Sequence, residues 1–67
     1  MRKVLKIYDV HYNVTYFKYF TNERFMRFAR TKRIGLAKVF SDEKEMKELH
    51  SNLIHMRKDY SYVWIDV

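Results

Sequence analysis

A dense cluster of basic residues is the part of this sequence best suited to do chemistry. Five cations fall within ten positions, namely Arg24, Arg27, Arg30, Lys32 and Arg33. Arginine presents planar, paired donors that match phosphate oxygens, and clustered cations neutralise successive phosphates of a nucleic acid. A surface helix usually mixes both signs of charge, whereas Glu23 is the one acidic residue beside this cluster. The cluster predicts a nucleic-acid-binding surface, and an ordinary solvated helix face is the alternative.

Aromatic residues are the second unusual feature, at 18% of the chain. Because helices on one side of a small sheet cannot bury every ring, some must face outward. The candidates are Tyr8, Tyr12, Tyr16, Tyr19, Tyr60, Tyr62 and Trp64. Of these, we expect Tyr60, Tyr62 and Trp64 to form an aromatic interaction face. Such rings can stack nucleic-acid bases, but they also dominate protein-binding surfaces, and a homodimer across the same sheet is a third alternative.

Patterns typical of catalysis or metal binding are weak. The histidines are His11, His50 and His55, and the last two, five positions apart, lie on different sides of a helix. Asp9 and His11 share a strand face, as in a general base with its orienting partner, but chance adjacency is the better explanation. We expect His50 to pack at the edge of the core and His55 to be solvated. The sequence predicts no catalytic residue, metal site or cofactor, and therefore no enzyme.

Length and composition limit the fold. A chain of 67 residues forms one small domain, residues 1–67, which buries only about 60% of its unfolded surface. The absence of cysteine excludes disulfides, thiol nucleophiles and cysteine-based zinc sites. A hydrophobic content of 48% and a charged content of 33% are typical of a folded protein. No uncharged stretch approaches the roughly 20 residues of a membrane-spanning helix, so we expect a cytoplasmic protein without a membrane partner.

The net charge of +6 is unevenly distributed along the chain. Residues 1–40 carry a net charge of +8, whereas residues 41–67 carry −2. This asymmetry predicts one side of the molecule that faces a polyanion and another that is neutral or acidic. The expected partner is therefore a nucleic acid or an acidic protein surface.

The elements that position these residues can be expected from the spacing of apolar positions. Residues 3–10 and 14–20 are rich in β-branched and aromatic residues, which predicts a hairpin of two strands. From residue 23 to residue 31 the apolar spacing becomes helical, with the arginines on the opposite side, which predicts a short helix. Residues 34–40 predict a third strand, in which Gly35 marks a bulge or a close packing contact.

A longer helix is predicted over residues 42–57. Ser41 and the acidic residues after it form a helix start, and Arg57 complements the dipole at the far end. The apolar seam of this helix consists of Met46, Leu49, Leu53 and Met56. Two heptads are too few for a coiled coil, so the seam should pack on the sheet. Residues 60–67 alternate in character and predict the last strand.

These elements predict an α+β fold. The expected architecture is a small single-layer antiparallel or mixed sheet of three to four strands with one long and one short helix, in the order β-β-α-β-α-β. We expect a small, basic, non-enzymatic accessory protein that binds nucleic acid through the Arg-rich helix, largely by phosphate contacts. The alternative is a protein-binding modulator, such as an inhibitor or adaptor of a larger host machine, that uses the aromatic sheet face. In composition, the chain resembles small accessory proteins of phages or mobile elements. Cations and aromatics on one shared surface favour nucleic acid, and separate surfaces favour a protein partner.

Overall fold

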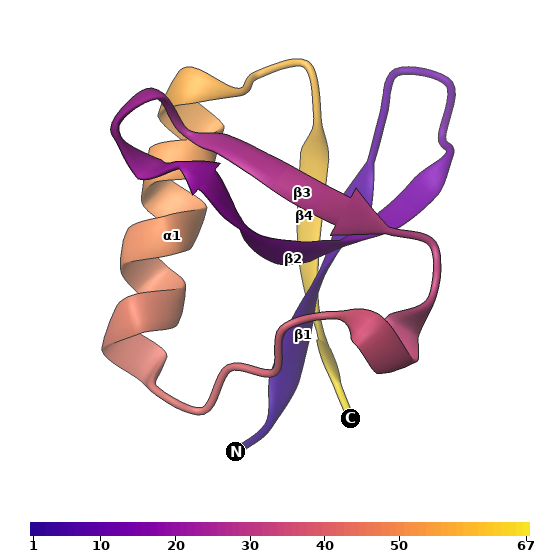
Figure 1. The fold of residues 1–67 in the computed structure, drawn as a ribbon, viewed down its shortest axis with the longest axis vertical. Coiled ribbons are helices and arrows are strands. Elements are labelled where there is room, and N and C mark those ends of the chain that lie inside the picture. Colours follow the sequence, from indigo (N-terminus) through magenta and orange to yellow (C-terminus); the bar gives the residue numbers. More distant parts are fainter.

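The chain forms a four-stranded antiparallel sheet with one α-helix packed against it (Figure 1). A computed structural model describes residues 1–67. Its elements are β1 (Lys3–Tyr8), β2 (Val14–Asn22), the 3-10 turn η1 (Glu23–Phe25), β3 (Arg27–Thr31), the 3-10 turn η2 (Ile34–Leu36), α1 (Glu43–Met56) and β4 (Ser61–Asp66). The strands lie in the order β3-β2-β1-β4. The α+β class is confirmed, with one α-helix where two helices were predicted.

The predicted short helix over residues 23–31 is wrong. Met26 adopts a left-handed backbone conformation, with φ of 52°, and η1 ends there after three residues. The chain then reverses, and β3 pairs antiparallel with β2, so that Phe28 lies opposite Phe20. Strand β2 is nine residues long and supplies the backbone partners of β3, which lie outside the segment that shows the helical spacing. This tertiary pairing overrides the helical spacing of residues 23–31.

The predicted strand over residues 34–40 is also wrong. The segment begins with η2, and only Phe40 forms a β-bridge, with Lys3 of β1. Two backbone hydrogen bonds of 2.9 and 2.7 Å join this pair. A methyl group at Gly35 would meet no atom within 4 Å, so neither a bulge nor close packing explains this glycine. The order of the main elements is therefore β-β-β-α-β.

The predicted long helix is confirmed as α1. Its N-cap is Asp42, whose carboxylate accepts hydrogen bonds from the backbone N–H groups of Lys44 and Glu45 at 2.9 and 3.4 Å. Three members of the predicted seam are buried, namely Met46, Leu49 and Leu53. The prediction is wrong for Met56, which is 54% exposed, because the helix ends at this residue.

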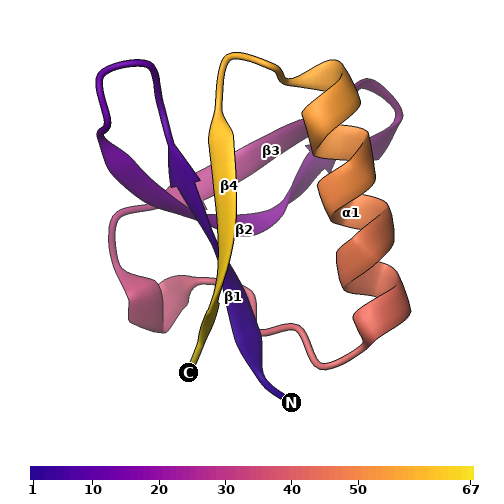
Figure 2. The ribbon, with the colours of Figure 1, turned by 180° about the vertical axis from the view of Figure 1, so that it is seen from behind.

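The hydrophobic core lies between α1 and the inner face of a curled sheet. At its centre is Phe17 of β2, whose ring centroid lies 5.1 to 5.8 Å from those of three other phenylalanines. The two register shifts between β2 and β3 allow this part of the sheet to bend. As a result, the rings of Phe28 in β3 and Tyr60 just before β4 are 6.4 Å apart, although these strands are opposite edges of the sheet. The predicted last strand is confirmed as β4, which lies beside β1 (Figure 2).

Candidate nucleic-acid interface

The structure disperses the predicted basic cluster. Arg24 lies in η1, Arg27 and Arg30 lie in β3, and Lys32 and Arg33 follow β3. Side chains alternate between the two faces of a strand, so Arg27 and Arg30, three positions apart, point to opposite faces. The five cations therefore do not form the single helical stripe that was predicted. None of them is in an ion pair, because the four ion pairs of the structure involve other residues.

Three of these arginines contact aromatic rings. The guanidinium carbons of Arg24 and Arg27 lie 5.7 and 5.9 Å from the ring centroid of Phe25. On the other face of the sheet, Arg30 and Arg57 each lie 4.8 Å from the ring centroid of Tyr60. A guanidinium over a ring is attracted by the ring quadrupole and keeps its outer N–H donors free for an anion.

The predicted aromatic face of Tyr60, Tyr62 and Trp64 does not lie on the uncovered side of the sheet. All three rings are half-buried and pack against the core on the side of α1. The indole N–H of Trp64 donates to Nδ1 of His50 at 3.0 Å, which confirms the predicted packing role of His50. The Tyr62 hydroxyl donates to the backbone carbonyl of Arg57 at 2.8 Å, and burial raises the pKa of Tyr62 to about 12.

A different set of rings and cations occupies the sheet face turned away from α1. In each strand, residues adjacent to a core residue must point away from the core, because side chains alternate. Core-facing positions on β1 and β2 include Leu5, Ile7 and Phe17. We call the surface that results the outer face, and its members include Lys6, Tyr8, Tyr16, Lys18 and Arg27. Tyr19 joins them because the register shift between Phe17 and Tyr19 interrupts the alternation, and the next residue, Phe20, packs against the core. No strand position on this face is Asp or Glu, so its charge has one sign.

Cations and tyrosines are interleaved on the outer face. Lys6 is the cross-strand partner of Tyr16, and its ammonium lies 5.0 Å from the ring centroid of Tyr8. A side-chain hydrogen bond with Tyr8 raises the pKa of Lys6, so its ammonium stays protonated further into the alkaline range. The ammonium of Lys18 lies 5.7 Å from the ring centroid of Tyr19, which is exposed. Sequence reasoning named these tyrosines as candidates but did not select them. The available signal was the Lys-x-Tyr and Tyr-x-Lys spacing at Lys6–Tyr8 and Tyr16–Lys18, which places both residue types on one strand face.

The histidine hypothesis finds no support in the loop between β1 and β2. The Asp9 carboxylate accepts hydrogen bonds from the backbone N–H groups of His11 and Asn13, at 2.8 and 2.9 Å, and from the Asn13 amide at 3.0 Å. The hydrogen bonds from Asn13 are the main reason why the pKa of Asp9 is lowered. Asp9 thus shapes the turn instead of orienting an imidazole, and His55 is exposed, as predicted. No group of three or more His, Asp or Glu side chains is placed to hold a metal ion.

No known protein family, curated protein or solved structure matches this chain. The one α-helix is 14 residues long, and no helix has the length and apolar character needed to cross a bilayer.

Proposed function

We propose that this protein is a non-enzymatic nucleic-acid-binding protein that holds a single strand against the outer face of its sheet. The observation that supports the proposal best is the mixture of three cations and three tyrosines on one face of the sheet, where no strand position is Asp or Glu. Proteins that bind single strands combine a positive surface, which follows the phosphates, with aromatic rings on which bases stack. The sequence-based criterion of one shared surface for cations and rings favours nucleic acid over a protein partner.

The residues of the outer face have distinct roles in this proposal. Lys6, Lys18 and Arg27 bind phosphates, while Tyr19, whose ring is exposed, stacks a base. One stacked base contributes about 1–3 kcal/mol, with little preference for its identity. Lys32 and Arg33 (both exposed, at the end of β3) and Arg24 extend the positive charge beyond the face. Binding should therefore depend strongly on salt and weakly on sequence.

Fluorescence anisotropy with labelled oligothymidylate and a generic duplex, between about 50 and 200 mM salt, tests the proposal. Three phosphate contacts on a single strand predict a log–log salt slope of about −2, since each contact contributes about −0.7. The Lys18→Ala variant should flatten that slope by about 0.7, whereas Lys44→Ala, an exposed lysine on α1, should not change it. The matched lysine controls for the general effect of net charge.

The tyrosine variants test the stacking step separately. Tyr19→Ala should weaken binding of the single strand by about 5- to 150-fold, and Tyr19→Phe, which keeps a ring, should restore most of the affinity. Tyr19 is 53% exposed, so neither substitution should unfold the protein. Binding weaker than about 100 μM to both probes at the low-salt end, where basic surfaces bind best, would contradict the proposal. Equal losses of affinity in the Lys18→Ala and Lys44→Ala variants would show that the net charge of the protein drives binding without a defined site.

A further inference from the structure

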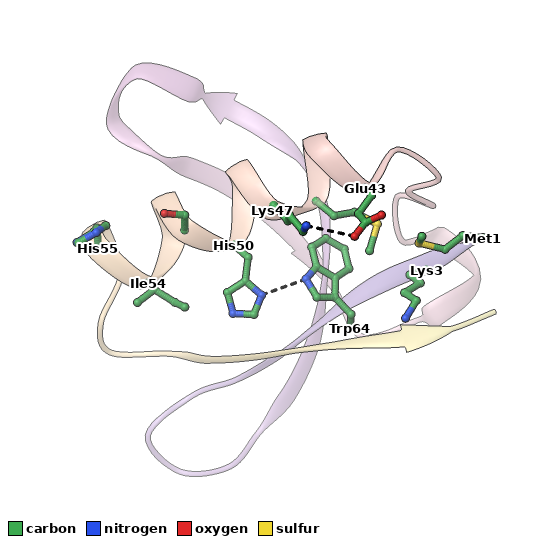
Figure 3. Close-up of a pocket in the computed structure, with 10 residues that line it drawn as sticks. Met1, Lys3, Glu43, Lys47, His50, Ile54, His55 and Trp64 are labelled. Carbon is green, nitrogen blue, oxygen red and sulfur yellow. Dashed lines mark hydrogen bonds and ion pairs between the residues drawn. The ribbon is translucent and has the colours of Figure 1, made fainter.

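A groove lies between α1 and β4, on the opposite side of the sheet from the outer face (Figure 3). Its volume is about 560 Å³, within the range of known ligand pockets. Trp64 of β4 and His50 of α1 point toward each other in the groove, and Met46 and Ile54 add apolar surface. Ile54 is 50% exposed and lies on the side of the groove formed by α1, where it is accessible to a ligand.

Strand β4 borders this groove and has an unpaired edge. The backbone N–H of Val67 donates to the carbonyl of Arg2 at 3.1 Å, which fixes the alternation of hydrogen-bonded pairs between β1 and β4. In an antiparallel pair every second residue directs its N–H and C=O groups to the other side. Tyr62, Trp64 and Asp66 therefore present their backbone donors and acceptors at the free edge, since β4 has no second neighbour in the sheet.

The β4 edge lacks the features that usually protect an edge strand. All six of its residues pair with β1 in regular register, it contains no proline, and its one charged residue is Asp66 at its last position, which is paired with Lys3. By contrast, the opposite edge, β3, carries Arg27 and Arg30 and pairs with β2 through two register shifts. Proteins commonly use charged side chains and irregular pairing to prevent unwanted strand addition. The asymmetry between the two edges singles out β4 as the edge open to a partner.

We propose that an extended peptide segment of another protein adds to β4 as a fifth, antiparallel strand and inserts an apolar side chain into the groove. Main-chain hydrogen bonds to the free edge would supply affinity, and the groove would select the side chain that faces α1. Alternate residues of the added strand point to the helix side, so one or two of them reach the groove. This site is separate from the outer face and does not depend on the proposed function.

A second copy of this chain fits the same edge poorly. If β4 paired with its symmetry mate, the side chains on the helix side would be Tyr62 and Trp64 of the second copy. Both are held in their own core, through the hydrogen bond of Tyr62 to Arg57 and the contact of Trp64 with Phe40 at 5.1 Å. They are not free to enter the neighbouring groove. Two copies with a charge of +6 each also repel one another, whereas a peptide with acidic flanks is attracted by the whole molecule and meets two lysines, Lys3 and Lys47, and one carboxylate, Glu43, in the groove lining.

Trp64 makes the proposal directly measurable, because it is the only tryptophan and it lines the groove. The probes are capped heptapeptides of alternating Val and Thr with Asp at both ends, in which the central residue is Ala, Leu, Phe or Trp. Trp64 emission reports the titrations of the Ala, Leu and Phe probes, and nuclear magnetic resonance follows the backbone amides with every probe, including the Trp probe. We expect saturable binding tighter than about 1 mM, strongest for a large central side chain. The exposed N–H groups of Tyr62, Trp64 and Asp66 should become protected from solvent exchange.

Two matched changes separate strand addition from nonspecific association. Ile54→Glu places a carboxylate in the groove and should weaken binding at least tenfold, while Met56→Glu changes an equally exposed apolar residue outside the groove and should change it less than twofold. N-methylation of the peptide amides that face β4 should abolish binding. The proposal is overturned if no peptide of the set binds, if both variants behave alike, or if the methylated peptide binds as well. Emission that changes with protein concentration alone, together with dimer formation in sedimentation, would assign the edge to a second copy instead.

Discussion

Truncating one buried and one exposed residue of the same predicted seam tests where the core ends. The sequence pattern places Leu53 and Met56 on one apolar stripe and predicts similar costs for their loss. In the structure, Leu53 is completely buried and contacts the core, whereas Met56 is 54% exposed at the last position of α1. We therefore expect Leu53→Ala to be severely destabilising and Met56→Ala to be nearly neutral.

The size of the effect follows from burial. Leu53→Ala removes three carbons, which is about 2.4 kcal/mol at roughly 0.8 kcal/mol per buried methylene. The cavity left behind adds to this loss, so the total should lie within about 2–5 kcal/mol. A chain of 67 residues has a free energy of unfolding of roughly 3–10 kcal/mol. Leu53→Ala therefore removes a large part of the stability, whereas Met56→Ala should change it by less than about 0.5 kcal/mol.

Urea denaturation followed by far-ultraviolet circular dichroism and by Trp64 fluorescence measures both variants. Leu and Ala differ little in helix propensity, so the comparison isolates packing. At a slope of about 1 kcal/mol per molar urea for a small domain, Leu53→Ala should lower the midpoint by at least about 2 M or unfold the protein in water. A loss below about 1 kcal/mol for Leu53→Ala, or an equal loss for Met56→Ala, would show that α1 packs on the sheet through a different face.

Two further predictions concern single tyrosines. The pKa of Tyr62 is raised to about 12, mainly by burial, because the folded state favours the neutral phenol. The stabilisation that this preference for the neutral phenol gives is complete below pH 10 and is lost as the pH rises toward 12. Over this interval the urea midpoint of the Tyr62→Phe variant should therefore fall less steeply than that of the unmodified protein. Tyr12 is 83% exposed and has a φ of 62°, a conformation that costs a residue with a Cβ about 1–2 kcal/mol. Glycine relieves this strain but loses more entropy on folding, so Tyr12→Gly should raise the free energy of unfolding by a net amount of about 0.5–1 kcal/mol. A decrease in the free energy of unfolding would show that the ring packs on the fold.

The elements that were predictable are those whose signals lie within a few residues. Helix α1 has its cap at Asp42, and Met46, Leu49 and Leu53 form a stripe at helical spacing. Its hydrogen bonds join residues four apart, so the pattern that specifies it is complete within the segment. Strands β1 and β2 could be recognised because β-branched and aromatic residues are concentrated in two short segments, and β4 because its residues alternate in character.

The segment from residue 23 to residue 31 shows what the sequence alone did not determine. Its helical spacing is real, but the backbone partners of β3 lie in β2, and only the folded chain brings them together. The change from helix to strand sends Arg27 and Arg30 to opposite faces, which removes the predicted arginine stripe.

The position of α1 decided which aromatic residues are covered. The alternation within β4 correctly grouped Tyr62 and Trp64, but it could not tell which side of the sheet the helix would occupy. Once α1 packs on that side, Tyr8, Tyr16 and Tyr19 remain on the uncovered side with Lys6 and Lys18. Hydrogen bonding within one segment specifies a helix, whereas the pairing of strands and the covered face of a sheet depend on contacts between different segments of the chain.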